Sequence, residues 1–198
     1  MAENDRSSMD AAALLVIDVQ DSFMAGPRWQ QRSTPDLESK LTTLVDAFRR
    51  AERPVFYFLH SDGDEHFSRS SPLYRLMGFL SPRPDEPVIH KTTRNALTST
   101  NLLPMLLQRG IRRVVITGIQ TEQCCETTAR VAADLGFDVD FVTEATMTFP
   151  ISEFTDGTGR QLSTAQIVER TEFALRHRFA RIASVAEIVA DLGVASPA

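Results

Sequence analysis

Short runs of consecutive apolar residues alternate along the chain with stretches in which apolar residues recur every three or four positions. Runs of the first kind are typical of strands buried on both faces of a sheet, and the second pattern is typical of helices that cover those faces. We expect strands at Ala12–Val19, Val55–His60, Val88–Lys91, Val114–Thr117, Val139–Val142 and Arg181–Ala183. Strands and helices that alternate in this way predict an α/β domain with a mainly parallel sheet.

The helices carry clearer boundary signals than the strands. Thr34 and Pro35 form an N-cap followed by proline at the first helical position, and the apolar stripe behind them predicts a helix. Further helices are expected over residues 102–109, 122–135 and 163–179, and after the capping-box pair Ser184 and Glu187. Gly110 and Gly136 follow the first two of these, where a left-handed residue commonly ends a helix.

These elements predict three layers, α/β/α, around a central, mainly parallel sheet of about six strands. The length suits a single domain over residues 1–198, with 1–9 and 194–198 as loose termini. Residues 61–87 and 146–162 have no regular pattern, and loops of that length inside a domain are usually functional. Ligands of open parallel sheets bind beyond the carboxyl ends of the strands, so we expect the site at that edge.

The composition of the chain limits the classes of partner that we expect it to bind. The chain is 42% hydrophobic and 24% charged, with a formal net charge of -5 and no basic stripe, which excludes an electrostatic nucleic-acid binder. No segment is apolar enough to span a membrane or to act as a signal peptide. The two cysteines are adjacent and cannot form a disulfide framework. We therefore expect a cytoplasmic protein that acts on a small molecule.

Cys124 lies where a β-branched run ends at Gly118 and a helical pattern begins. A thiol at such a turn is close to the first N–H groups of a helix and to the positive end of its dipole. Both effects favour the thiolate, which is the nucleophilic form of cysteine. The alternative is a small buried core cysteine.

Asp18 follows four apolar residues at the end of the first expected strand, and Lys91 ends the third. Taken alone, Asp18 could open a turn and Lys91 could protect an edge strand. Together with Cys124, however, they fall at carboxyl ends of strands and can converge on one crevice. There the carboxylate would accept the thiol proton and later deliver it to a leaving nitrogen, while the ammonium holds the carboxylate ionised. Backbone N–H groups at the turn could bind the oxyanion.

Three motifs in this order resemble the isochorismatase-like cysteine hydrolase superfamily. They are Val-Ile-Asp-Val-Gln-Asp-Ser-Phe at 16–23, Lys91, and Gly-Ile-Gln-Thr at 118–121 followed by Cys124. The resemblance extends from about Ala12 to Val189. It implies an isochorismatase-like, Rossmann-type fold, and it makes Asp18, Lys91 and Cys124 the catalytic triad. No organic cofactor is needed for that chemistry.

The resemblance also implies a cis peptide bond between Ile119 and Gln120, which would aim the N–H groups of Gln120 and Cys124 into an oxyanion hole. Cys125 stands where the family usually has valine, and consecutive helical residues point about 100° apart, so we interpret Cys125 as a core residue. Glu144 stands where the family commonly has aspartate, and we interpret it as structural.

Nicotinamidase-like members carry an Asp-x-His metal motif in the loop after the second strand. Here the order is His-x-Asp, with His60, Asp62 and His66 as potential ligands, so we expect a solvated acidic loop and no metal. The loop at 23–29 could form an aromatic wall of the pocket, or pack in the core or against a subunit. The expected substrate contacts are Phe23, Trp29, His60 and Thr121.

The sequence favours hydrolysis of a carbon–nitrogen bond in a small amide, carbamoyl or related molecule through a thioester on Cys124. Isochorismatase-type cleavage of a vinyl ether, which depends on the acid more than on the thiol, is the chemical alternative. A non-enzymatic, thiol-sensing binding module is the alternative from another class. Members of the resembled family are commonly dimers or tetramers, so we expect a homo-oligomer. The apolar run Pro72–Leu80 would form the subunit contact or fold back over its own sheet.

Overall fold

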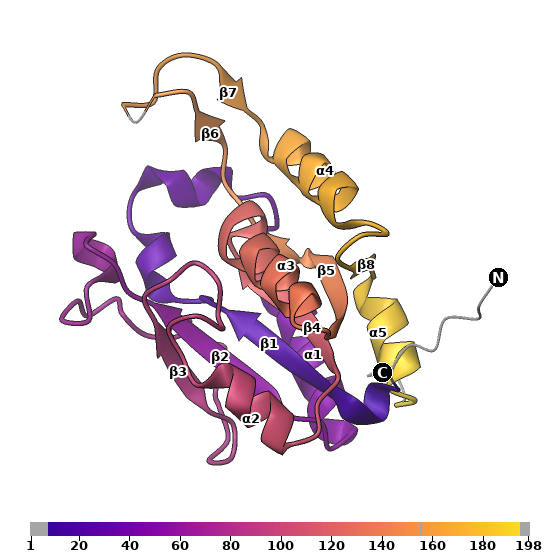
Figure 1. Ribbon diagram of the computed structural model, residues 1–198. Coiled ribbons are helices and arrows are strands. Elements are labelled where there is room, and N and C mark those ends of the chain that lie inside the picture. The colour runs from indigo at the N-terminus through magenta and orange to yellow at the C-terminus, as the bar shows by residue number, and fades with distance from the viewer. Residues whose placement is uncertain (1–7, 155, 195–198) are drawn as a thin grey trace.

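The computed structural model describes residues 8–154 and 156–194, and its centre is one parallel sheet (Figure 1). The strands are β1 (Ala12–Ile17), β2 (Val55–His60), β3 (Val88–Lys91), β4 (Arg113–Ile119), β5 (Asp138–Met147) and β8 (Arg181–Ile182). Their order in the sheet is β3-β2-β1-β4-β5-β8, and every neighbouring pair is parallel. The predicted parallel sheet is therefore confirmed, with β4 and β5 longer than expected.

Burial on both faces explains the unbroken apolar runs. In β1, Leu15 and Ile17 belong to one core cluster, whereas Leu14 and Val16 belong to a second cluster on the opposite face. All residues of β1 are buried. A strand with two buried faces needs apolar residues at every position, which is why its sequence shows no alternation.

In the part of the chain that the structure describes, five α-helices cover the two faces of the sheet (Figure 1). They are α1 (Leu37–Arg50), α2 (Leu102–Gln108), α3 (Glu126–Asp134), α4 (Thr164–Leu175) and α5 (Val185–Asp191). Side chains of α2, α3 and α4 pack into one core cluster, and those of α1 and α5 into the other. This is the predicted three-layer arrangement. The capping boxes that open α4 and α5 are formed by Ser163 with Gln166 and by Ser184 with Glu187.

Three helix boundaries differ from the prediction by more than one residue. Helix α3 begins at Glu126 rather than at Glu122, because residues 121–125 form a π-helical turn. The first helix begins at Leu37 rather than at Thr34, because the Thr34 hydroxyl donates a hydrogen bond to the carbonyl of Thr146 at 2.7 Å and does not cap the helix. Helix α4 ends at Leu175 rather than Phe179, because the chain turns back through His177, which has a φ of 63°.

Short elements subdivide the two long stretches without a pattern. The first contains the 3₁₀ helix η4 (Glu65–Phe67), and the second contains a hairpin of β6 (Ile151–Ser152) and β7 (Gln161–Leu162). The hairpin projects away from the sheet (Figure 1). Further 3₁₀ helices are η1 (Met9–Ala11), η2 (Asp21–Met24) and η3 (Pro27–Gln31). Elements of two to five residues are too short for hydrophobic periodicity to reveal them.

The apolar run Pro72–Leu80 folds back over its own sheet. Met77 and Leu80 are buried, the N–H of Met77 donates to the carbonyl of Val19 at 3.0 Å, and Leu76 pairs with Gln20. Of the two alternatives for this run the intramolecular one is observed, so the run gives no support to a subunit contact. Oligomerisation itself stays a prediction.

The expected loose termini lie mostly outside the described residues, although Met9 packs against the core. Within the described ranges, no helix is both long and apolar enough to cross a membrane.

Gly118 allows the two central strands to approach each other at their carboxyl ends. It has a φ of 121°, and a Cβ atom at this position would overlap the carbonyl group of Ile17 in β1. Only glycine fits both the conformation and the space. Because Asp18 follows Ile17 directly, this contact positions the end of β1 against the end of β4.

We expect Gly118→Ala to destabilise the protein by several kcal/mol, because the new methyl group must displace the backbone of β1 as well as adopt a disfavoured φ. Gly110→Ala is the matched control, since Gly110 also has a positive φ, 67°, but nothing lies within 4 Å of its added Cβ. The control should lose only about 1–2 kcal/mol. Urea unfolding followed by circular dichroism measures both, and equal losses would contradict the steric argument.

Candidate active site

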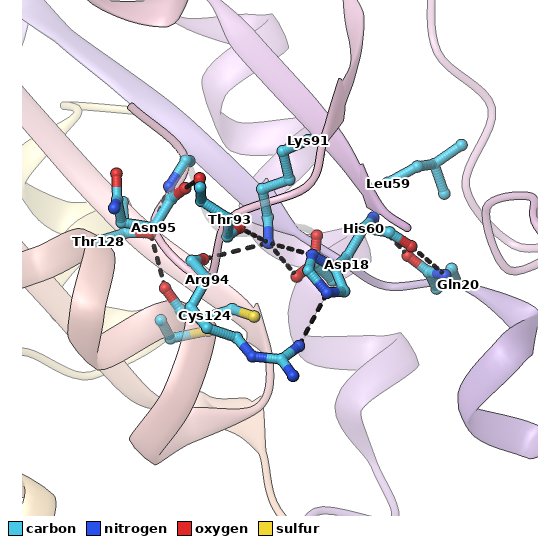
Figure 2. A network of polar contacts seen from close by, with 12 residues as sticks. Asp18, Gln20, Leu59, His60, Lys91, Thr93, Arg94, Asn95, Cys124 and Thr128 are labelled. Atoms are coloured by element: carbon cyan, nitrogen blue, oxygen red, sulfur yellow. Dashed lines mark hydrogen bonds and ion pairs between the residues drawn. The ribbon is translucent and has the colours of Figure 1, made fainter. Parts of the chain in front are cut away.

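The site lies beyond the carboxyl ends of the strands, where the strand order reverses between β1 and β4. Connections run outward in both directions from this point, which leaves a crevice between the loops. Asp18 follows β1, Lys91 ends β3, and Cys124 lies after β4 in the π-helical turn η5 (Thr121–Cys125). The structure brings these three side chains together (Figure 2).

Asp18 and Lys91 form a fully buried ion pair. The Lys91 Nζ lies 2.7 Å from Asp18 Oδ2, and both side chains are 0% exposed. The ammonium also donates to the carbonyl groups of Thr93 and Arg94, each at 3.1 Å, and lies 3.3 Å from His60 Nδ1, so polar groups surround it. Asp18 Oδ1, by contrast, is buried and has no hydrogen-bond partner in the described part of the chain. One carboxylate oxygen is therefore available to a reacting group.

The Cys124 thiol faces this ion pair and is only 3% exposed (Figure 2). Burial and the negative charge of Asp18 raise its pKa to about 12, against a smaller opposing effect of Lys91. The expectation that the turn favours a thiolate is therefore wrong, because burial and the adjacent carboxylate outweigh the stabilisation of a charge at a helix start. At neutral pH the thiol is protonated, and a base must remove its proton during any attack.

Cys125 is a core residue, as its position on the helix predicted. It is fully buried, and its Sγ donates to the carbonyl of Thr117 at 3.7 Å. Glu144 is structural as well, since its Oε1 accepts a hydrogen bond from the N–H of Val185 at the start of α5. The adjacent cysteines thus have different surroundings, and only Cys124 borders the crevice.

The peptide bond between Ile119 and Gln120 is cis, as the family resemblance implied. The carbonyl of Gln120 accepts hydrogen bonds from the N–H groups of Gln123 and Cys125, at 3.2 and 3.1 Å. The Gln120 side-chain Nε2 is buried and has no partner among the residues that the structure describes. An oxyanion hole made by the N–H groups of Gln120 and Cys124 stays a prediction.

A cavity of about 300 Å³ opens in front of Cys124. Its aromatic wall consists of Phe23, Phe67 and Phe149, with ring centroids 4.9 Å apart for Phe23–Phe67 and 6.0 Å apart for Phe23–Phe149. Its polar wall includes His60 and Gln120. A cavity of this size suits a small molecule. Phe23 and His60 therefore lie where the sequence predicted substrate contacts.

Trp29 and Thr121 do not line this cavity, which corrects two expected substrate contacts. The Trp29 ring lies 6.4 Å from that of Phe149 and borders a neighbouring cavity of about 480 Å³. Thr121 is fully buried, and its hydroxyl shares a 2.8 Å hydrogen bond with Thr146. Phe149, from the loop after β5, supplies the aromatic wall that we expected from Trp29.

His60 lies between two cationic side chains. Its Nδ1 is 3.3 Å from the Lys91 Nζ, and its Nε2 is 2.8 Å from Arg94 Nη1 and 3.3 Å from Asp62 Oδ2. Burial and the charge of Lys91 lower the pKa of His60, so the imidazole is neutral at neutral pH.

The His60 and Asp62 side chains lie against a cation of the protein itself, and the absence of a metal ion stays a prediction. The guanidinium of Arg94 lies against both, 3.6 Å from Asp62 Oδ2, and brings a positive charge to the place that a cation would take. His66 lies in the cavity wall without joining this pair as a third ligand. Across the described ranges, no group of three His, Cys, Asp or Glu side chains is arranged to hold a metal ion.

Sequence reasoning missed several residues of the cavity, among them Arg28, Phe67, Arg94 and Phe149. Two of them carried a usable signal, because Arg94 follows Lys91 by three residues in the loop beyond a strand end and Arg28 lies in the loop at 23–29 that could form a wall of the pocket. Phe67 and Phe149 come from the two long segments without a periodic pattern, whose packing the sequence does not reveal.

Comparison with known proteins agrees with this fold. The model of the isochorismatase domain matches residues 12–187. An isochorismatase family protein of Bacillus subtilis is 28% identical over 90% of this chain and 95% of its own length. Nicotinamidase 3 of Arabidopsis thaliana is 36% identical over 70% of this chain and 74% of its own. The crystal structure of an isochorismatase-family protein from Chromobacterium violaceum superposes with a TM-score of 0.86 at 29% identity, covering 98% of this chain and 99% of the other.

The charges around Cys124 predict opposite effects of two substitutions on its alkylation by iodoacetamide. Asp18→Asn removes the negative charge that raises the thiol pKa, so the pKa falls and alkylation near neutral pH becomes faster. Lys91→Met removes a positive charge that lowers it, so the pKa rises further and alkylation becomes slower. Rates measured across a pH series, in a Cys125→Val background, check both directions.

Lys91→Met leaves a buried carboxylate without its partner, which costs about 3–5 kcal/mol and calls for a thermal unfolding control. The double variant Asp18→Asn/Lys91→Met removes both charges and should give an intermediate thiol pKa. Slower alkylation of Asp18→Asn than of the parent protein would contradict the assignment of the carboxylate.

Proposed function

This chain belongs to the isochorismatase family of hydrolases, and from this starting point we propose that it hydrolyses a carbon–nitrogen bond in a small amide, carbamoyl or related molecule. One observation carries the proposal: the Cys124 thiol borders a small cavity and faces a buried Asp18–Lys91 ion pair with one unpartnered carboxylate oxygen. A relative named as a nicotinamidase adds support for an amide as substrate.

In the first half of the reaction, Cys124 Sγ attacks the carbonyl carbon while its proton passes to Asp18. The raised thiol pKa makes such a base necessary, because almost no thiolate exists beforehand at neutral pH. Asp18 then gives the proton to the nitrogen as the carbon–nitrogen bond breaks. The nitrogen leaves as ammonia or an amine, and the acyl group stays on sulfur as a thioester.

In the second half, water attacks the thioester carbon and gives one proton to Asp18. The carbon–sulfur bond breaks, the acid leaves, and the proton returns to Cys124. The Lys91 ammonium stays against Asp18 throughout and offsets the negative charge that develops on sulfur during the cycle. The N–H groups of Gln120 and Cys124 would bind the negative oxygen of both tetrahedral intermediates.

The geometry favours this chemistry over a thiol sensor. Redox-sensing cysteines have a low pKa and are accessible, whereas Cys124 has a raised pKa and is buried. Vinyl-ether cleavage would need Asp18 but gives no role to a thiol placed beside it.

We also propose a reducing compartment such as the cytoplasm, because both cysteines are free and a nucleophilic thiol must stay reduced. A homo-oligomer remains part of the proposal. Its support is the set of exposed apolar side chains on the β6–β7 hairpin and α4, namely Phe154, Leu162 and Phe173.

Cys124→Ala should abolish ammonia release from a panel of small amides, carbamates and hydroxamates, because no thioester can form. Cys125→Val is the matched control at the adjacent position and should retain activity, since it replaces a buried core thiol with an apolar side chain. Mass spectrometry of acid-quenched enzyme should find the acyl adduct on Cys124. Full activity of Cys124→Ala would overturn the thioester mechanism, and retained cleavage of a vinyl ether by that variant would favour the alternative chemistry.

Asp18→Asn should lower turnover of an amide substrate by about 10²–10⁴, because the amide side chain cannot carry the proton from sulfur to nitrogen. The same substitution makes the thiol easier to ionise, so loss of turnover together with faster alkylation would separate proton transfer from thiol activation. Steady-state kinetics measure the first quantity. An unchanged kcat would mean that the carboxylate is structural.

A further inference from the structure

The side chain of Gln120 is a buried carboxamide that makes no hydrogen bond with any residue that the structure describes. The residue is only 6% exposed, and its Nε2 is buried without a partner. No described residue donates a hydrogen bond to its Oε1 either. A buried polar group in this state is unfavourable, because it has lost its contacts with water and gained none in their place. We therefore expect its partner to come from outside the chain.

Gln20 shows how the same side chain is satisfied elsewhere in this protein. It is fully buried, and its Nε2 donates to Ser22 Oγ at 2.9 Å and to the carbonyl of His60 at 3.1 Å. Its Oε1 accepts a hydrogen bond from the N–H of His60 at 2.8 Å. These bonds join the segment after β1 to the end of β2, which gives Gln20 a structural role. Gln120 has no comparable bond within the described ranges.

Gln120 lies in the wall of the cavity in front of Cys124. Its main-chain carbonyl accepts hydrogen bonds from the N–H groups of Gln123 and Cys125, at 3.2 and 3.1 Å. The backbone from which the side chain extends is therefore fixed to the turn that carries the nucleophile. A small molecule that occupies the cavity can supply the partner that the protein does not.

Two arginines of the same wall, by contrast, lie near carboxylates of the protein. Arg94 is 3.6 Å from Asp62 Oδ2. The negative charge of Glu122 acts on Arg28. A charged group of a ligand would have to lose its water and compete with these contacts, whereas an uncharged group needs only the hydrogen bond that a carboxamide offers. The partner that fits Gln120 is therefore uncharged.

We propose that the Gln120 side chain determines specificity by donating a hydrogen bond from Nε2 to an uncharged acceptor of the substrate, such as an ether or hydroxyl oxygen near the scissile amide. This inference rests on the proposed amide hydrolysis. It concerns the side chain and is separate from the main-chain N–H of Gln120, which the oxyanion hole would use. The aromatic wall of Phe23, Phe67 and Phe149 contacts the hydrocarbon part of the substrate.

The chain supplies two matched controls. Gln120→Met keeps the main-chain N–H and nearly the volume of the side chain but removes the carboxamide. Gln123→Met makes the same chemical change at a half-buried position of the same turn and the same cavity wall. Gln20→Met makes it at the glutamine that bonds to the protein.

The test measures binding by NMR titration in a Cys124→Ala background, so that the ligands stay intact. One set of probes is butyramide, methoxyacetamide and β-hydroxypropionamide, and the other is valeramide, β-methoxypropionamide and γ-hydroxybutyramide. Within each set the molecules have the same number of non-hydrogen atoms and differ in one oxygen. We expect at least one oxygen-bearing amide to bind about three- to tenfold more tightly than its alkyl relative, the difference that one uncharged hydrogen bond supplies. Gln120→Met should remove this preference, and Gln123→Met should leave it unchanged.

Thermal unfolding separates recognition from a structural role. Gln120→Met should not lower Tm, because the substitution breaks no hydrogen bond with the described part of the chain. Gln20→Met should lower Tm, because it leaves the N–H and the carbonyl of His60 without their partner. Equal losses of stability in the two variants would overturn the inference.

Equal affinities within both sets, a preference that survives Gln120→Met, or failure of every probe to bind would also overturn it. A preference that Gln123→Met removes would assign the contact to the wrong glutamine and reject the role of Gln120. These outcomes differ from a failure of the proposed function. Ammonia release that depends on Cys124, together with no preference for an oxygen-bearing amide, would retain amide hydrolysis and reject the role of Gln120. Absence of any acyl adduct on Cys124 would reject the hydrolysis itself.

Discussion

The buried ion pair between Asp18 and Lys91 is the interaction on which the rest of the site depends. Two charges with no solvent exposure are tolerable only when each is held by a partner of opposite charge and by further hydrogen bonds. The ammonium also contacts the carbonyl groups of Thr93 and Arg94 and the ring of His60, and the two carbonyl groups require the loop after β3 to close over it. That closure also brings the Arg94 side chain to His60. Burial of this ion pair therefore accounts both for the charges in the site and for the position of the loop after β3.

Burial, together with the carboxylate of this pair, raises the pKa of Cys124 and favours a thiol over a thiolate in the resting protein. A buried carboxylate beside a buried thiol disfavours a second negative charge, and the lysine offsets this effect only in part. Such a thiol is unreactive until a base removes its proton, and the base we propose is the same carboxylate, whose Oδ1 has no hydrogen-bond partner among the described residues. One arrangement is thus consistent with both properties of the thiol. It protects the resting thiol from unwanted oxidation or alkylation, and it allows activation of the thiol during the proposed reaction.

The sheet topology brings Asp18, Lys91 and Cys124 together in one site. Parallel strands place all their carboxyl ends on one edge, and the reversal of strand order between β1 and β4 opens a crevice there. Gly118 lets β4 approach β1 closely at that edge, where any side chain would meet the Ile17 carbonyl. Long loops then supply the cavity walls, and their aromatic side chains leave room for a small molecule in front of the thiol.

The sequence by itself determined the parallel sheet, the starts of α4 and α5, and the three polar residues that end or follow strands. These features follow from local rules: burial on both faces demands continuous apolar runs, capping boxes start helices, and carboxyl ends of parallel strands share an edge. Only the tertiary structure decided the protonation of Cys124, the place of Phe149 in the wall expected for Trp29, and the contact of Arg94 with His60. Each of these depends on distances between segments far apart in the chain, and no local pattern encodes such distances.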